Sequence, residues 1–318
     1  MNNKSKPDNK SQPFQLENGV AQGRLVRLGE TINKVLTARN YPKEVAELLG
    51  ELQVIAGLMS GVLKFNGVLS IQIKGDGAVT LLLVDVTTSG KMRGLARFDL
   101  EKLIKLNNNP SVGSQQKVPR FLGNGYFALT VDQGPDSEPY QGVVSLEGAT
   151  LAECAHNYFN QSAQLDAALK VVVSEIENKN GSAWRGGGVL LQRLASAGVQ
   201  RLGGETKDLD IEEAWRRAVI FLGSCTNDEM LDPNLHPHNL LFRLFSEDGV
   251  RVFEPSALQM ECRCSRERIQ NVLVAFPLDE VESMKVNGEV VVTCEFCNVD
   301  YRFCESQIND IFRERKSV

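Results

Sequence analysis

The sequence has no run of apolar residues long enough to span a membrane. The longest apolar stretches, VTLLLVDV at residues 79–86 and AVIFLG at 218–223, are shorter than the roughly 18 residues that a spanning helix needs. The polar residues 1–13 also lack the apolar segment of a secretory signal. We therefore expect a cytoplasmic protein with no membrane partner, in which thiols stay reduced and structural disulfides are disfavoured.

The sequence also has no excess of positive charge. Its 318 residues carry a net charge of −5, whereas a protein that binds nucleic acid needs a basic surface to meet the phosphates. We therefore expect no nucleic-acid partner.

Motifs of common enzyme classes are missing as well. The glycine-rich stretches WRGGGVLL and LGNGYF have neither P-loop nor Rossmann spacing, and we expect their glycines to serve turns. His236 and His238 have no third ligand in register, so we expect them to be structural or solvated. Because no nucleophile, base and orienting group lie close together in the sequence, we predict that the protein is not an enzyme.

The apolar pattern predicts an α+β protein with a disordered tail at residues 1–13. In the α+β domain expected at 14–195, Leu69, Ile71 and Ile73 alternate with polar residues before an Asp76-Gly77 turn. This alternation is typical of an antiparallel sheet with one buried face. Apolar residues at helical spacing after Pro42 indicate a helix that contains several glycines and therefore depends on packing.

Residues 196–258 are predicted to form a helical linker. The stretches IEEAWRRAVIFLGS and NLLFRLFSE have apolar faces at helical spacing and are separated by turn-rich segments. Because short helices with loose joints need their neighbours to stay folded, we expect this part to open. Opening would expose six apolar side chains of these helices: Trp215, Val219, Leu222, Leu241, Leu244 and Phe245.

Four of the seven cysteines form two close pairs near the C-terminus, in a predicted domain of residues 259–318. Cys262 and Cys264 flank one residue of an extended segment, and Ser265 is a candidate N-cap of the helix that follows. Cys294 and Cys297 lie at the expected tip of a hairpin that Asn287-Gly288 introduces. This spacing predicts a four-cysteine zinc site, closed to substrate; the alternative is a set of buried thiols in a small apolar core.

The pairs also bear on redox chemistry. Arg263, Arg266 and Arg268 lie beside the first pair, where they would either favour reactive thiolates or form a solvated helix face. A disulfide between cysteines two residues apart in an extended segment would be strained and easily reduced. Because residues 259–318 are too few to be stable without the metal, oxidation should unfold this end of the chain.

The sequence closely resembles the redox-regulated heat-shock holdases, the thirty-three-kilodalton chaperonin family of bacteria. The most specific matches are MECRCSRERIQNVL and VTCEFCNVDYRF, and LLGE, GDGAV, MRGLAR, YQGVVSLEG and GGVLLQ extend the resemblance upstream. It therefore covers nearly the whole chain.

The resemblance implies an ATP-independent chaperone that is inactive while one zinc ion per chain is bound. It implies that Cys262, Cys264, Cys294 and Cys297 are the ligands. Under oxidative stress the disulfides Cys262–Cys264 and Cys294–Cys297 would form and zinc would be released. The linker would then loosen and expose the six apolar side chains named above, which are the candidate surface for binding unfolding client proteins. The active form would be a homodimer.

Two positions depart from the family pattern. Ala163 stands where an acidic residue is expected, and Cys304 is an additional C-terminal thiol. We expect Cys304 to be a buried small side chain, although it could divert oxidation into a different disulfide.

Two other classes of function compete with the chaperone. A zinc ribbon that binds nucleic acid is disfavoured because residues 256–318 hold eight Lys or Arg against eleven Asp or Glu. A thiol oxidoreductase is disfavoured because its C-x-x-C motif begins a helix, whereas Cys294 follows a strand-like run. Loss of zinc with no gain of client binding would favour either alternative.

Overall fold

The computed structural model describes residues 8–63, 65–108, 116–134, 137–178, 181–194 and 210–315. The chain divides into two compact units, Met1–Met260 and Glu261–Val318. The predicted boundary at 258–259 lies beside this division. The other predicted boundary, at 195–196, lies outside the described residues, so the separation of the linker from the first domain stays a prediction.

Two antiparallel sheets form the larger unit. Sheet A has the order β10-β1-β2-β9-β8, with β11 also paired to β1. Its strands are β1 (Lys10–Leu16), β2 (Ala21–Leu28), β8 (Ala167–Asn178), β9 (Gly181–Arg193), β10 (Val250–Val252) and β11 (Ser256–Ala257).

Strand β1 corrects the predicted tail of residues 1–13. Lys10 pairs with both Arg27 and Ala257, and Phe14 is almost fully buried. The segment from residue 10 to 13 is therefore an inner strand of sheet A rather than disordered chain; residues 1–7 lie outside the described part. Two of its partner strands, β10 and β11, are distant in the sequence, and the polar side chains of residues 10–13 hid the strand from a reading based on local polarity.

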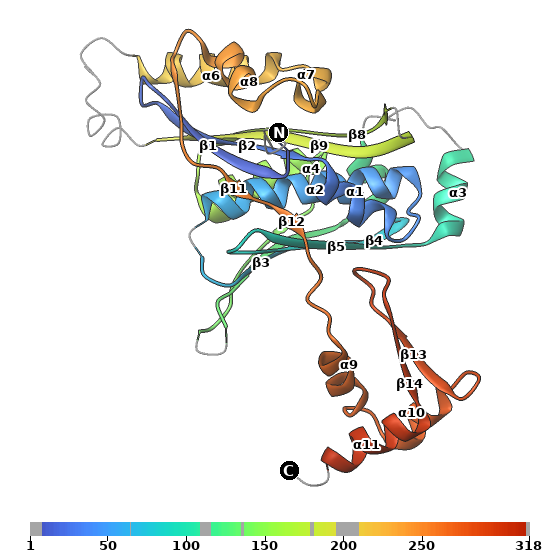
Figure 1. Cartoon of the computed structure of the whole chain (residues 1–318). Coiled ribbons are helices and arrows are strands. Elements are labelled where there is room, and N and C mark those ends of the chain that lie inside the picture. The colour runs from blue at the N-terminus through green and yellow to red at the C-terminus, as the bar shows by residue number, and fades with distance from the viewer. Residues whose placement is uncertain are drawn as a thin grey trace. The chain divides into compact units, whose positions relative to one another are not determined.

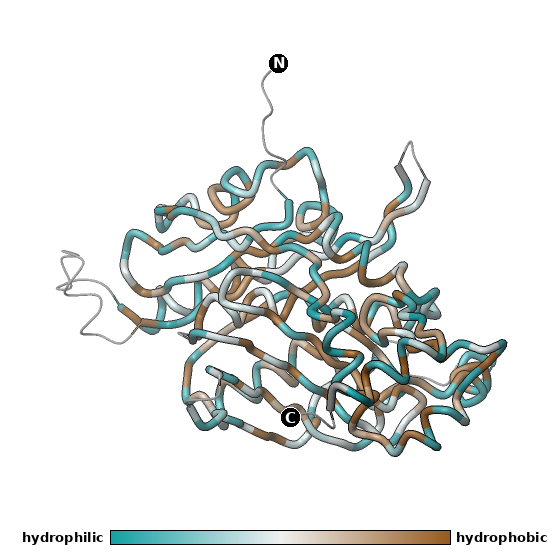
Figure 2. The backbone as a smooth tube through the Cα atoms, turned by 60° about the horizontal axis from the view of Figure 1, so that its bottom comes forward, coloured by the Kyte–Doolittle hydropathy of each residue, from teal (hydrophilic) through white to brown (hydrophobic). Residues whose placement is uncertain are grey.

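Sheet B has the order β12-β5-β4-β3-β6-β7. The pattern of buried positions along β3 alternates as predicted. Figure 2 shows hydrophilic and hydrophobic stretches interspersed along the backbone. All pairs are antiparallel except β12 with β5. The strands are β3 (Val68–Gly75), β4 (Val79–Thr87), β5 (Lys91–Phe98), β6 (Gly125–Asp132), β7 (Tyr140–Ser145) and β12 (Gln259–Met260).

Helix α2 (Lys43–Val62) lies between the two sheets (Figure 1). By length and composition it could cross a membrane, which corrects the expectation that no segment could, but 72% of the apolar stretch is buried inside the protein. The other elements around the sheets are α1 (Glu30–Thr37), α3 (Leu100–Asn108), α4 (Leu151–Tyr158) and the short π-helical turns η1 (Val118–Leu122) and η2 (Phe159–Ala163).

Three short helices cover the opposite face of sheet A (Figure 1): α6 (Ile211–Ser224), α7 (Asn227–Leu231) and α8 (Pro237–Phe245). They share a second apolar core with that face, in which the rings of Phe14 and Phe245 stack with centroids 5.7 Å apart. Sheet A therefore packs against helices on both sides.

The glycines of WRGGGVLL lie inside strand β9, so the expectation that they serve a turn is wrong. A Cβ atom at Gly186 or Gly188 would lie 2.7 Å from a side chain facing the inner core. At Gly187, which faces the other way, it would lie 2.7 Å from Met230 Cγ. The glycines allow helices to approach both faces of the sheet.

The smaller unit consists of α9 (Arg266–Leu273), α10 (Leu278–Ser283), β13 (Glu289–Thr293), β14 (Asp300–Cys304) and α11 (Glu305–Arg315). Strands β13 and β14 pair as a hairpin. The buried apolar residues of its core are few: Leu273, Val281, Val290, Phe303 and Ile308. So small a core supplies little stability by itself.

Replacing Ile55, which is fully buried in α2, by alanine should lower the free energy of unfolding by about 2–5 kcal/mol because it leaves a cavity. Urea denaturation of the larger unit's signal measures this change. Ile104→Ala is the matched control, because that side chain in α3 is 51% exposed and its loss should change stability by less than about 0.5 kcal/mol. Equal losses would show that α2 is not the packed centre.

Candidate metal centre

Four cysteines of the smaller unit bring their sulfur atoms together. The Sγ atoms of Cys262, Cys264, Cys294 and Cys297 all lie within 4.8 Å of one another. Two of the separations join the two segments, at 3.6 Å between Cys262 and Cys294 and 3.4 Å between Cys264 and Cys297. All four are free thiols, and three are half-buried while Cys294 is buried.

The second pair lies in a tight turn at the end of the β13–β14 hairpin. The amide of Cys294 donates to the carbonyl of Val299 at 2.9 Å, and the amide of Asn298 donates back to the Cys294 carbonyl at 2.9 Å. Asn298 has φ of 59°, a left-handed conformation that asparagine tolerates better than most residues. The turn thus directs both thiols to the same side, as the sequence predicted.

The first pair lies in the segment that leads into α9. Ser265 accepts a hydrogen bond from the amide of Arg268 at 3.2 Å, which confirms the predicted N-cap. Asn287 and Gly288 have φ of 53° and 83°, as a type I′ turn before β13 requires. These local signals are what allowed the site to be located from the sequence.

The sulfur cluster is compatible with zinc. Four thiolates with Zn–S bonds of about 2.3 Å in a tetrahedron have sulfur atoms about 3.8 Å apart. The observed separations of 3.4 and 3.6 Å, with all four atoms within 4.8 Å, are close to that size. The four side chains can therefore hold one metal ion, with no position left open for substrate.

Three of the clustered thiols have shifted pKa values. Burial raises the pKa of Cys262 and, together with neighbouring thiols, that of Cys297. Burial also acts on Cys264, but hydrogen bonds from Tyr301 and the other cysteines outweigh it and lower its pKa to about 7. The Tyr301 hydroxyl donates to Cys264 Sγ at 3.1 Å. Cys264 is thus more readily ionised than Cys262 and Cys297.

Tyr301 was missed by the sequence analysis. Arg266 and Arg268 are exposed on α9, which agrees with the alternative of a solvated helix face, and both also make contacts within the small unit. Arg266 donates to the Arg302 carbonyl at 3.0 Å and lies over the Phe303 ring, 4.3 Å from its centroid. Arg268 donates to the Arg263 carbonyl at 2.8 Å. These two arginines therefore bind backbone and packing groups of the small unit.

The remaining cysteines lie outside the cluster. Cys154 is buried, which raises the pKa of its thiol to about 12, and burial also raises the pKa of Cys225. Cys304 was expected to be buried, but it is half-buried, with Sγ 3.2 Å from Ser306 Oγ. Hydrogen bonds from Ser306 and Gln307 lower its pKa.

The two linker histidines belong to the α8 N-terminus rather than to a metal site. His236 Nδ1 accepts from the amide of His238 at 3.2 Å, and the His238 ring contacts Gln12 Oε1 at 3.0 Å. Among the described residues, the four-cysteine cluster is the one group found with metal-binding geometry. A structural role for the histidines agrees with the sequence expectation.

The predicted client-binding side chains lie in α6 and α8. Trp215 and Val219 are half-buried, whereas Ile220 and Phe242, which were not chosen, are 62% and 65% exposed. The other four are buried against sheet A: Leu222, Leu241, Leu244 and Phe245. In this structure the candidate surface is therefore covered, and it would need the helices to detach before it could bind anything.

The comparisons with known proteins identify the family. The sequence profile of the Hsp33 protein family matches residues 9–304. The chain belongs to the Hsp33 family. It is 41% identical to the 33 kDa chaperonin of Caulobacter vibrioides over 290 residues, 91% of this chain and 92% of that protein. It is 36% identical to the 33 kDa chaperonin of Pseudomonas aeruginosa over 305 residues, 95% and 94% of the two chains.

A solved Hsp33 homologue confirms the α+β fold. The structure of the 33 kDa chaperonin of Thermotoga maritima matches with a TM-score of 0.75 at 20% identity, covering 98% of this chain and all of that one. The resemblance noted from the cysteine motifs is thereby confirmed for the family. Ala163, where the sequence departs from the family pattern, lies half-buried in η2, far along the chain from the cysteine pairs.

Metal affinity should fall as the pH falls. Thiols must lose their protons to become ligands, and the raised pKa values of Cys262 and Cys297 mean that both hold protons at neutral pH. Each ion bound should therefore displace at least two protons, and the apparent zinc affinity should fall about a hundredfold per pH unit of acidification. Competition with a chromophoric chelator at pH 6, 7 and 8 measures this slope; a flat profile would contradict it.

Proposed function

We propose that this chain is a redox-regulated, ATP-independent holdase chaperone of the cytoplasm, with one zinc ion per chain in its inactive, reduced state. The observation that carries the proposal is the cluster of four thiols in the small unit of an Hsp33-family chain. The name of its relatives describes a chaperone rather than an enzyme.

In the reduced state the four cysteines would hold the small unit together. When bound, zinc would be held by the thiolates of Cys262, Cys264, Cys294 and Cys297 and would supply folding free energy, of roughly 10–16 kcal/mol in small zinc peptides. Tyr301 would stabilise the thiolate of Cys264 by donating a hydrogen bond from its hydroxyl group. The apolar core is too small to replace this contribution.

Oxidation would remove the ligands. A peroxide or hypochlorite takes two electrons from each pair of thiols, two protons are lost, and a sulfur–sulfur bond forms. Family resemblance supports the pairs Cys262–Cys264 and Cys294–Cys297, although sulfur atoms of different segments also lie close together in the reduced structure, at 3.4 and 3.6 Å. Disulfide sulfurs are no longer thiolate ligands, so the site loses the ion and the small unit loses its main support.

Loss of the small unit's structure would loosen the linker helices. Residues 210–258 would then leave sheet A, and the apolar side chains of α6 and α8, with the sheet face beneath them, would become available to unfolding client proteins. The buried position of Leu241 and Phe245 is consistent with a surface that is hidden until activation. We further propose that the oxidised form is a homodimer, as the family resemblance implies.

Cys294→Ser and Cys304→Ser form a matched pair that tests the ligand assignment. The first substitution removes one of the four clustered thiols, so the purified protein should lose most of its zinc, about one ion per chain. The second removes a thiol outside the cluster and should leave the zinc content unchanged. Zinc measured by mass spectrometry of the purified variants decides between them, and equal zinc content in both would exclude the four-cysteine site.

The chaperone activity itself can be tested by light scattering from a client that unfolds on heating. Zinc-loaded reduced protein should leave aggregation unchanged, whereas protein treated with peroxide or hypochlorite at raised temperature should suppress it and release zinc in the same sample. Disulfide mapping of the oxidised protein tests the pairing. Equal suppression in both states, or none in either, would reject the redox-regulated chaperone and leave a structural zinc unit.

A further inference from the structure

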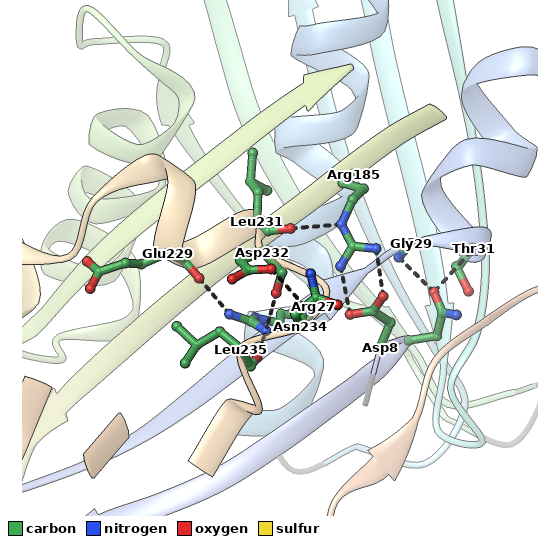
Figure 3. Close-up of polar contacts among 11 residues, drawn as sticks. Asp8, Arg27, Gly29, Thr31, Arg185, Glu229, Leu231, Asp232, Asn234 and Leu235 are labelled. Carbon is green, nitrogen blue, oxygen red and sulfur yellow. Dashed lines mark hydrogen bonds and ion pairs between the residues drawn. The ribbon is translucent and has the colours of Figure 1, made fainter. Parts of the chain in front are cut away.

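Two arginines of sheet A hold the end of α7 and the turn that follows it (Figure 3). Arg27 comes from β2 and Arg185 from β9. Their guanidinium groups donate to four backbone carbonyl groups, those of Glu229, Leu231, Asp232 and Leu235. We call these six residues the carbonyl latch.

Arg27 makes three of the four bonds. Its Nη2 donates to Glu229 at 2.6 Å, and its Nη1 donates to Asp232 at 3.0 Å and to Leu235. The side chain is only 2% exposed, and its Nε is buried with no hydrogen-bond partner in the described part of the chain. Burying a guanidinium is costly, and the three carbonyl bonds are the direct compensation in this structure.

The carbonyl groups need these donors. Helix α7 has five residues, too few to be stable alone, and the carbonyls at a helix end have no partners within the helix and carry partial negative charge. The carbonyl latch supplies both the missing donors and the opposite charge. If the latch opened, the carbonyl groups at the end of α7 would have to accept hydrogen bonds from water, and the helix would be less stable.

Arg185 connects the latch to the segment before the cysteines. Besides donating to Leu231 at 2.9 Å, it forms a two-bond ion pair with Asp8, at 2.7 and 2.9 Å. The next residue, Asn9, accepts a hydrogen bond on its carbonyl from the amide of Leu258 at 2.8 Å. Leu258 is buried and is followed by β12 and then by Cys262. A continuous path of hydrogen bonds and covalent bonds therefore links Leu258, four residues before Cys262 in the chain, to α7.

The contact between α7 and the sheet is also close enough to be broken sterically. A Cβ atom at Gly187 would lie 2.7 Å from Met230 Cγ and 3.0 Å from the Met230 carbonyl oxygen. No side chain fits there unless α7 moves. This observation is independent of the arginines and concerns the same docked position.

We propose that the carbonyl latch holds the linker in its inactive position, and that opening of this latch is the step that couples loss of the small unit to exposure of the client surface. The proposal rests on the proposed function and names the residues that regulate it. Arg27 and Arg185 are positioning residues: they fix where α7 lies and take no part in thiol chemistry.

Arg27→Met in the full-length, zinc-loaded, reduced protein tests the latch, because it removes the donors and keeps an apolar stem. Amide hydrogen exchange in residues 227–245 should become at least about tenfold faster, as expected when several charge-assisted hydrogen bonds are lost. Exchange in sheet B and the zinc content should stay unchanged, and client aggregation should be suppressed without oxidant. Arg27→Lys, which keeps the charge but lacks the planar fork, should give intermediate exchange.

Two controls match the test. Arg216→Met removes an exposed arginine from α6 and should change none of these readouts. Gly187→Ala should reproduce the effect of Arg27→Met by wedging α7 away, whereas Gly223→Ala, where an added Cβ meets nothing within 4 Å, should not. The Gly187 variant also keeps the test valid if Arg27→Met does not fold.

Unchanged exchange at 227–235 in both Arg27→Met and Gly187→Ala would overturn the latch. Faster exchange without suppression of aggregation would overturn its link to activation. Oxidised wild-type protein in the same assay separates that result from a failure of the proposed function, because a chaperone must suppress aggregation after oxidation whether or not the latch controls it.

Discussion

Four sulfur atoms, contributed by two segments separated by residues 265–293, are the constraint on which the smaller unit depends. Its apolar core consists of a few buried side chains from two helices, a hairpin and the C-terminal helix, and such a core leaves little margin against chain entropy. The thiolates are also the most easily oxidised groups in the unit. In the proposed zinc-bound state, stability and sensitivity to oxidants therefore reside in the same atoms.

The larger unit distributes its stability differently over the two faces of sheet A. On the inner face α2 is enclosed by both sheets and packs through fully buried aliphatic side chains. On the outer face the chain places short helices, and the shortest of them is tied down through its backbone by arginines. Removing the outer helices would leave the enclosed core intact. The two sheets and α2 could therefore stay folded while the outer helices move.

The sequence predicted the cysteine site well because its determinants are local. Asn287-Gly288 requires a turn, Ser265 caps the helix beside it, and the spacing of each pair sets the direction of its thiols. What it missed depends on contacts that exist only in the folded chain. Strand β1 pairs with β2, β10 and β11. Tyr301 reaches Cys264 only after the hairpin folds. The need for glycine at position 187 in β9 arises only because Met230 packs over it. The polarity and hydrophobic periodicity of the sequence do not indicate such contacts.

Strand β12 pairs with β5 up to Met260, and Glu261 alone separates Met260 from Cys262 in the chain. The connection between the paired strand and the first cysteine is therefore one residue long. A long flexible linker at this position would absorb any rearrangement of the cysteines, and the structure of the rest of the chain would not change. With one intervening residue, a change of backbone direction at Cys262 has to be taken up either by the small unit or by the end of the sheet.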